Sequence, residues 1–130
     1  MDETLLHYDI AEDATEVRPG AYDALYLLRQ FADVYVFSAG GPDYIRDRLT
    51  ETRMRNMVNG AFSVQNYPGP EWIGRRKWVL LDNDAFLADV KCSLIDPEGP
   101  CRWIEVEDFL GQSRVVPLTA YLQTVKQALA

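Results

Sequence analysis

Two short runs of consecutive apolar residues stand out along the chain, Val34–Phe37 and Trp78–Leu81. Neither run shows the alternation of apolar and polar residues that a half-exposed strand would have. Unbroken apolar runs of this length are typical of parallel strands that are buried on both faces. Around them, apolar residues recur at helical spacing. The pattern therefore predicts an α/β fold with buried parallel strands.

Helical stripes and turn residues define the remaining elements. Pro19-Gly20 and Pro42-Asp43 mark helix starts, because proline is favoured in the first turn of a helix. The pattern predicts helices over Ala21–Phe31, over Tyr44–Met57 and from Pro117 onward. Weaker signals predict a strand at Ala61–Gln65, a short helix at Ala85–Ala88, strands at Cys92–Ile95 and Arg102–Val106, and loops at Asp9–Glu16 and Asn66–Gly74.

Length and charge narrow the class of protein. A chain of 130 residues is enough for one domain, residues 1–130. Its net charge of -7 argues against a nucleic-acid partner or an anionic membrane, since both bind basic surfaces. No apolar run approaches the ~20 residues of a membrane span, and the acidic start is not a signal peptide. Cys92 and Cys101 lack metal-ligand spacing, so we expect reduced thiols in a cytoplasmic or nuclear protein.

Two strand ends carry candidate chemistry. Val34–Phe37 leads into Ser38-Ala39-Gly40-Gly41 and then a helix, an arrangement that points free backbone N–H groups and a helix dipole at a phosphate. Trp78–Leu81 leads into Asp82-Asn83-Asp84. Carboxylates with an amide at the carboxyl end of a strand suit Mg2+, and ligands of open α/β sheets bind at that end.

The first residues after Met1, Asp2-Glu3-Thr4-Leu5-Leu6-His7, resemble the first motif of the haloacid dehalogenase (HAD) superfamily. The form is that of the small C-terminal-domain phosphatases, also called NLI-interacting-factor-like or FCP-homology phosphatases, which read Asp-x-Asp-Glu-Thr-Leu-(Val/Leu)-His. Asp2 takes the second Asp of that motif. The family's nucleophile, the first Asp, corresponds to the position before Met1. Arg18-Pro19, Val36–Gly40 and Trp78–Asn83 resemble later features of the family in the same order.

The resemblance implies an HAD-like, doubly wound sheet with helices on both faces, N-terminally incomplete and lacking the central strand that carries the nucleophile. It implies Mg2+-dependent hydrolysis of a phosphomonoester through an aspartyl-phosphate. Phosphoproteins, small phosphomonoesters and nucleic-acid ends remain open as substrates. The implied roles are acid/base catalysis and a metal-facing carbonyl for Asp2, support of the turn for Thr4, phosphate binding for Ser38, Ala39, Gly40 and Lys77, and metal binding for Asp82 and Asn83.

The missing nucleophile leaves other readings open. The chain as given is expected to be inactive. It would be either a phosphatase whose recorded start is too late, or a catalytically silent HAD-like module that binds phosphate or a protein. A receiver-like regulatory domain with Asp82 as phosphate acceptor is a further alternative, although it does not account for the motif at residues 2–7. Without its central strand, the chain is expected to be poorly soluble, to pair the two exposed strand edges with each other, or to borrow a strand from a partner.

Overall fold

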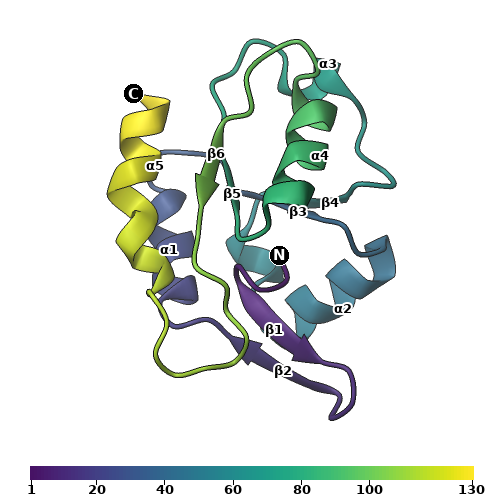
Figure 1. Cartoon of the computed structure of the whole chain (residues 1–130), viewed down its shortest axis with the longest axis vertical. Helices are drawn as coiled ribbons and strands as arrows, with labels where there is room; N and C mark the ends of the chain where they lie inside the picture. Colours follow the sequence, from purple (N-terminus) through teal and green to yellow (C-terminus); the bar gives the residue numbers. More distant parts are fainter.

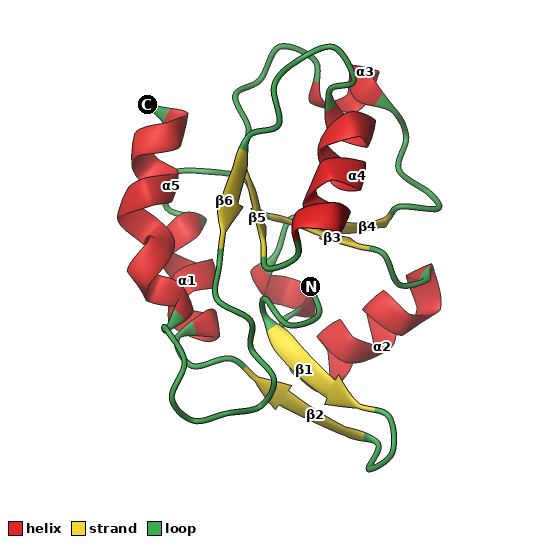
Figure 2. Cartoon of the chain, in the orientation of Figure 1, coloured by secondary structure: helices red, strands yellow, loops and turns green.

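Strands pair only in twos in the computed structural model, which describes residues 1–130 (Figures 1 and 2). The fold is mixed α/β, with one antiparallel pair, two parallel pairs and five α-helices. The strands are β1 (Leu6–Asp9), β2 (Ala14–Val17), β3 (Tyr35–Ser38), β4 (Gly60–Ser63), β5 (Leu80–Asp82) and β6 (Trp103–Glu105). The helices are α1 (Ala21–Leu28), α2 (Pro42–Glu51), α3 (Pro70–Ile73), α4 (Ala85–Ile95) and α5 (Leu122–Leu129), with 3-10 turns at Arg55–Met57 and Leu118–Tyr121.

The two apolar runs form parallel strands, as predicted. β3 pairs with β4, and β5 pairs with β6, each in parallel. However, β3 and β5 do not pair with each other, so the expectation that the two exposed edges would close on one another is wrong. Met1 and Leu5 line the space between these strands and are buried, and Met1 shares a core cluster with Val36. Their side chains therefore occupy room that direct pairing would require.

The predicted loop at Asp9–Glu16 is instead a β-hairpin. β1 and β2 pair from Leu6 opposite Val17 to Asp9 opposite Ala14. The Asp9 carboxylate accepts hydrogen bonds from the backbone amides of Ala11 and Glu12. The Tyr8 hydroxyl donates to the Asp13 carboxylate over 2.7 Å. Most hairpin side chains face solvent, so the sequence carries no apolar alternation to reveal it.

The predicted helix over Tyr44–Met57 is interrupted. α2 begins at Pro42 and ends at Glu51, and a separate 3-10 turn follows. Arg53 between them has a positive φ of 63°, which a helix cannot contain. The first helix also ends early, at Leu28 rather than Phe31, and α3 lies within the stretch predicted as a loop.

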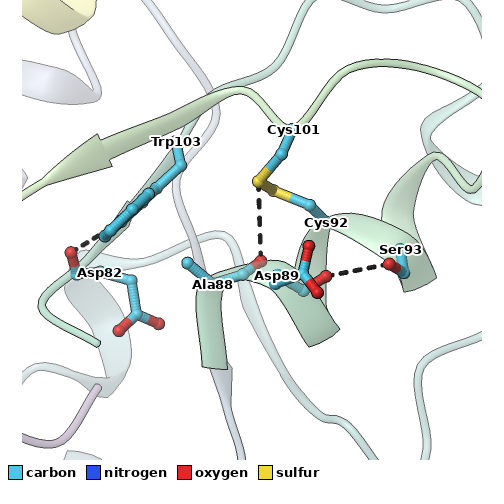
Figure 3. Close-up of a disulfide and its surroundings, with 7 residues drawn as sticks. All are labelled: Asp82, Ala88, Asp89, Cys92, Ser93, Cys101 and Trp103. Atoms are coloured by element: carbon cyan, nitrogen blue, oxygen red, sulfur yellow. Dashed lines mark hydrogen bonds between the residues drawn. A yellow bond between two sulfur atoms is a disulfide. The ribbon is translucent and has the colours of Figure 1, made fainter. Parts of the chain in front are cut away.

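α4 runs well past the short helix predicted at Ala85–Ala88, so the strand predicted at Cys92–Ile95 is wrong. Its buried residues recur at helical spacing and pack toward β5; they are Ala88, Lys91, Cys92 and Ile95. The expectation of reduced thiols is also wrong, because Cys92 forms a disulfide with Cys101 in the segment that leads into β6 (Figure 3). The expected cytoplasmic or nuclear location rested on those thiols and loses that support.

Two apolar clusters form the core. The larger joins the N-terminal residues to α1, β3 and α2, and the smaller joins β5 to α4. α5 and the 3-10 turn before it pack beside α1 (Figure 1). None of the helices has both the length and the hydropathy that a membrane crossing requires. The amino-terminal residues Met1, Leu5 and Leu6 belong to the larger cluster, and the candidate site lies beside them.

Candidate functional site

Residues 1–5 form a tight turn, called here the acidic turn. The Met1 carbonyl accepts hydrogen bonds from the Thr4 and Leu5 amides over 3.2 and 2.9 Å. Glu3 has a positive φ of 64°, and its amide donates to the Leu6 carbonyl. Met1, Thr4 and Leu5 are buried, whereas Asp2 is exposed. The buried side chains of Met1 and Leu5 therefore anchor the turn, whereas the Asp2 carboxylate is exposed to solvent.

A buried arginine holds this turn in place. Arg18 is only 1% exposed, and its guanidinium donates to the carbonyl of Thr4 over 3.3 Å and of Glu107 over 2.7 Å. It also donates twice to the carbonyl of Val116, over 3.1 and 2.8 Å. Burial lowers the pKa of Arg18 from its ordinary value. The sequence indicated Arg18 only as part of an Arg-Pro pair before a helix. Its hydrogen bonds to the carbonyls of Thr4, Glu107 and Val116 were not predicted.

A tyrosine connects the acidic turn to the carboxyl end of β3. The Tyr44 hydroxyl donates to the Asp2 carboxylate over 2.9 Å. The Tyr44 ring lies against Gly40, where an added Cβ would come within 2.7 Å of it. The amide of Gly40 donates to the buried Ser38 hydroxyl over 3.1 Å. Burial, followed by the hydrogen bond to Asp2, raises the pKa of Tyr44, so the hydroxyl keeps its proton for that bond.

At the carboxyl end of β5, a buried ion pair holds Asp82. The Lys91 ammonium lies 2.5 Å from one carboxylate oxygen of Asp82, and both side chains are 3% exposed. The other oxygen accepts from the Asp84 amide over 2.9 Å. The Trp103 indole donates to the Asp82 carbonyl over 2.9 Å (Figure 3). Asp82 is therefore held by Lys91 of α4, by Trp103 of β6 and by the Asp84 amide in the turn that follows it.

Asn83 connects the acidic turn to this second strand end. The Thr4 hydroxyl donates to the Asn83 side-chain oxygen over 3.1 Å. The Asn83 amide donates to Glu3 over 3.1 Å and to Asp108 over 2.9 Å. The acidic turn thus contacts the ends of β3 and β5 together. Asn83 was expected at the site from the sequence, whereas its partners Glu3 and Asp108 were not.

The amino group of Met1 lies at the same junction. It is fully buried, and burial, followed by the nearby positive charge of Lys91, lowers its pKa to about 5. The carboxylates of Asp82 and Asp2 act in the opposite direction and do not offset these effects. This nitrogen is therefore uncharged at neutral pH, and it marks the point where the acidic turn meets Asp82.

One predicted residue lies away from the others. Lys77 is exposed, and its ammonium donates to the Ala130 carbonyl over 2.6 Å. Among the predicted residues, Thr4 bonds directly to Asn83, which follows Asp82 in the chain. Asp2 is connected to Ser38 only through Tyr44 and Gly40. Lys91 is the lysine that reaches the site. A prediction of one helix over Ala85–Ile95 would have indicated this lysine, because Lys91 lies on the same face of that helix as the apolar residues Ala88 and Cys92.

The donors at this junction have the chemistry of a Mg2+ site but not its arrangement. Carboxylate and amide oxygens of Asp82, Asn83, Glu3 and Asp108 are hard ligands. Yet one Asp82 oxygen is bound to Lys91, and no group of three or more His, Cys, Asp or Glu side chains is set to hold a metal ion. A cation would have to compete with Lys91 for Asp82.

Comparison with known proteins adds no family to this description. No protein-family model matches the chain, and no curated protein matches it.

Proposed function

We propose that residues 1–130 supply the phosphate-binding and acid/base side chains of an HAD-type phosphomonoester phosphatase. The observation that carries this proposal is the acidic turn, which bonds to Asn83 directly after β5 and to Tyr44 of α2, whose ring lies against Gly40 after β3. Ligands of α/β proteins bind at such strand ends. On this proposal, the parallel pairs belong to a doubly wound, HAD-like sheet, and the substrate is a phosphorylated molecule, with phosphoproteins and small phosphomonoesters both in scope.

We assign the roles that the family resemblance implies to the residues that lie at this junction. Asp2 is the exposed carboxylate and acts as the general acid and base, with Tyr44 orienting it. Ser38 and the backbone of Ala39 and Gly40 hold the phosphoryl oxygens at the start of α2. The positive charge comes from Lys91 rather than Lys77, because only Lys91 lies at the junction. The nucleophilic carboxylate that the family resemblance implies is not among these side chains.

Asp82 and Asn83 would hold the cation, together with the Asp2 carbonyl. When bound, Mg2+ would offset the negative charge that accumulates between a carboxylate and an anionic substrate. Asp82 is buried, so its carboxylate needs a cationic partner in any state. In the absence of metal, Lys91 provides that partner.

A second candidate is a catalytically silent module that binds phosphate. The closed ion pair between Lys91 and Asp82 favours it, since that pair occupies the carboxylate the metal would need. Such a module would bind phosphate at Ser38 without turnover.

The test compares chain 1–130 with two forms extended at the amino end by Val-Val-Leu-Val-Asp or Val-Val-Leu-Val-Asn. We expect hydrolysis of p-nitrophenyl phosphate with Mg2+ only for the Asp-ended form. In that form, Asp2→Asn should lower kcat by about 100-fold or more, in line with the usual contribution of general acid–base catalysis. Lys77→Met should leave kcat unchanged.

Two results would contradict the proposal. Activity of the Asn-ended form, or of chain 1–130 with Asp2 replaced, would require another nucleophile. A folded Asp-ended form without turnover, but with phosphate binding that Ser38→Ala abolishes, would support the silent module instead.

A further inference from the structure

A cavity of about 300 Å³ lies between α2 and β4. Its lining comes from one face of α2, from the 3-10 turn that follows this helix, and from β4 and the turn after it. Neither Ser38 nor Gly40 lines the cavity, so it is separate from the phosphate-binding residues proposed above. Its volume is at the lower end of the range for small-molecule sites. The cavity is therefore large enough for a small ligand.

The charged side chains that line this cavity are all cationic. They are Arg46 of α2 and Arg55 of the 3-10 turn, and no Asp or Glu is among the lining residues. The whole chain, by contrast, has 20 acidic and 13 basic residues. The Arg46 guanidinium lies 3.3 and 3.4 Å from the carboxylates of Asp43 and Asp47, which share its charge. Arg55 is exposed, and none of the ion pairs in the chain includes it. The cavity therefore has an excess of positive charge.

A buried hydroxyl at the end of β4 has an unused proton. Ser63 lines the cavity and is only 1% exposed. Its hydroxyl oxygen accepts a hydrogen bond from the Gln65 amide over 3.1 Å, but the hydroxyl donates to no group of the chain. Buried donors are normally paired, because a buried donor without an acceptor is unfavourable. Ser63 therefore indicates that an acceptor binds in this cavity.

Two more donors lie beside Ser63, and both of their residues line the cavity. The Asn66 side-chain oxygen accepts from the Ser63 amide over 2.8 Å, which leaves the Asn66 NH2 group without an acceptor in the chain. The Val64 amide donates to the Ser38 carbonyl, so Val64 faces β3. Residues of a parallel strand alternate between its two edges. The Ala61 amide must therefore face the free edge of β4, where no strand pairs with it.

This set of donors favours a phosphate group as the ligand. The donors come from α2, from the 3-10 turn, from β4 and from the turn after it, so they surround a ligand from several directions. A planar carboxylate is satisfied by one guanidinium fork. A phosphate monoester has three terminal oxygens and a larger negative charge. The lining also includes the apolar side chains of Ile45, Leu49 and Val58. A phosphomonoester with a short carbon body would cover this apolar surface, whereas inorganic phosphate would not.

We propose that the cavity between α2 and β4 binds a small phosphomonoester. Arg55, Arg46 and the donors of Ser63, Asn66 and Ala61 hold the phosphate, and the organic part lies against the apolar side of the cavity. The proposal assigns binding and no reaction to this site. It does not depend on the phosphatase proposal, since it uses none of the residues assigned there.

The experiment titrates isotopically labelled chain 1–130 with glycerol 3-phosphate and follows its NMR resonances. The reporters are the Ala61 amide, the Asn66 side-chain NH2 group and the Arg55 Nε–H. We expect saturable shifts at all three. Glycerol 3-phosphate should bind more tightly than inorganic phosphate, and acetate should produce no saturable shift. The Gly40 amide reports separately on binding at Ser38.

Three substitutions of exposed arginines, which should leave the fold intact, test the contacts. Arg55→Gln should weaken the binding of glycerol 3-phosphate by about 10-fold or more, because it removes a hydrogen bond to a charged group. Arg46→Gln should weaken it less, because two carboxylates of α2 already share that charge. Arg53→Gln is the matched control, since Arg53 is close to Arg55 in the sequence but does not line the cavity. It should change the affinity by less than about 2-fold, because salt screens the charge of an exposed side chain.

Each other outcome overturns part or all of the proposal. Shifts confined to Gly40, or no saturable shift at Ala61 and Asn66, would overturn the site. Equal weakening by Arg53→Gln and Arg55→Gln would show a general attraction of anions to this turn and no defined site. Equal binding of acetate would overturn the choice of phosphate. Inorganic phosphate that binds as tightly as glycerol 3-phosphate would overturn the role of the organic part and assign the site to free phosphate.

Discussion

At the scale of single residues, Lys91 and Asp82 form the most constrained contact of the site. Both are almost fully buried, and each lacks any other opposite charge at bonding distance. Removing one partner of a buried ion pair leaves an uncompensated charge, which costs far more than the net contribution of the pair. Substituting each lysine in turn therefore separates Lys91, which lies at the site, from Lys77, which does not.

We expect Lys91→Met to lower the free energy of unfolding by about 3–5 kcal/mol, because it leaves the Asp82 carboxylate buried and without its cation. Lys77→Met is the matched control and should change the free energy by less than about 0.5 kcal/mol, since Lys77 is exposed. Urea unfolding at pH 7 measures both. The double variant Lys91→Met with Asp82→Asn should recover most of the loss. Equal midpoints for Lys91→Met and wild type would show that the ion pair does not hold Asp82.

At the scale of elements, the disulfide joins α4 to the segment before β6. Cys92 is buried beside Ala88 and Ile95, whereas Cys101 is exposed and within reach of a reductant. The bridge therefore links the helix that carries Lys91 to the strand whose Trp103 bonds to Asp82 (Figure 3). Its loop is short, with a sequence separation of 9.

We expect Cys101→Ser to destabilise the chain by about 2–3 kcal/mol, the contribution expected from closing so short a loop. Thermal melting with and without dithiothreitol measures this. Wild type should lose stability on reduction, whereas Cys101→Ser should not respond. A wild-type melting curve that is insensitive to full reduction, confirmed by thiol counting, would contradict a stabilising role for the bridge.

At the scale of the whole molecule, a free amino group at Met1 would link the folding of chain 1–130 to pH. Its pKa is 8.0 in the unfolded chain and about 5 in the folded one. Between these values the unfolded chain binds more protons, so stability should rise as pH increases from 5 to 8. The protonated amine has a net penalty in the fold because its site, near Asp82 and Lys91, is buried.

The expected rise across this range is at most about 4 kcal/mol, since each unit of pKa difference corresponds to about 1.4 kcal/mol. Urea unfolding at steps of pH between 5 and 8 measures it. The control is the Nα-acetylated chain, which keeps every other titrating group, His7 included, and should lose this slope. Identical pH profiles for the two chains would show that the amine is not buried in solution.

Local pattern determined the parallel strands and most helices. Val34–Phe37 and Trp78–Leu81 were recognisable because a strand buried on both faces must be apolar throughout. Prolines likewise marked the starts of α1 and α2. Ser38 and Asp82 could be assigned to strand ends for the same reason. These features depend only on neighbours in the chain, so the sequence alone contains them.

Tertiary contacts decided the rest. The β1–β2 hairpin was missed because its side chains face solvent and leave no apolar period. The Cys92–Ile95 stretch belongs to α4 because Cys92 and Ile95 are buried together with Ala88 at helical spacing beside β5. Lys91, and not Lys77, lies at the site, because its position in α4 places it on the buried face of the helix beside Asp82. Lys77 is nearer to Asp82 in the sequence, but its side chain is exposed and bonds to Ala130. The space between β3 and β5 is likewise a property of strand pairing, because β3 pairs with β4 and β5 with β6 and not with each other. Each pairing joins residues more than 20 positions apart, such as Tyr35 with Gly60 and Leu80 with Trp103.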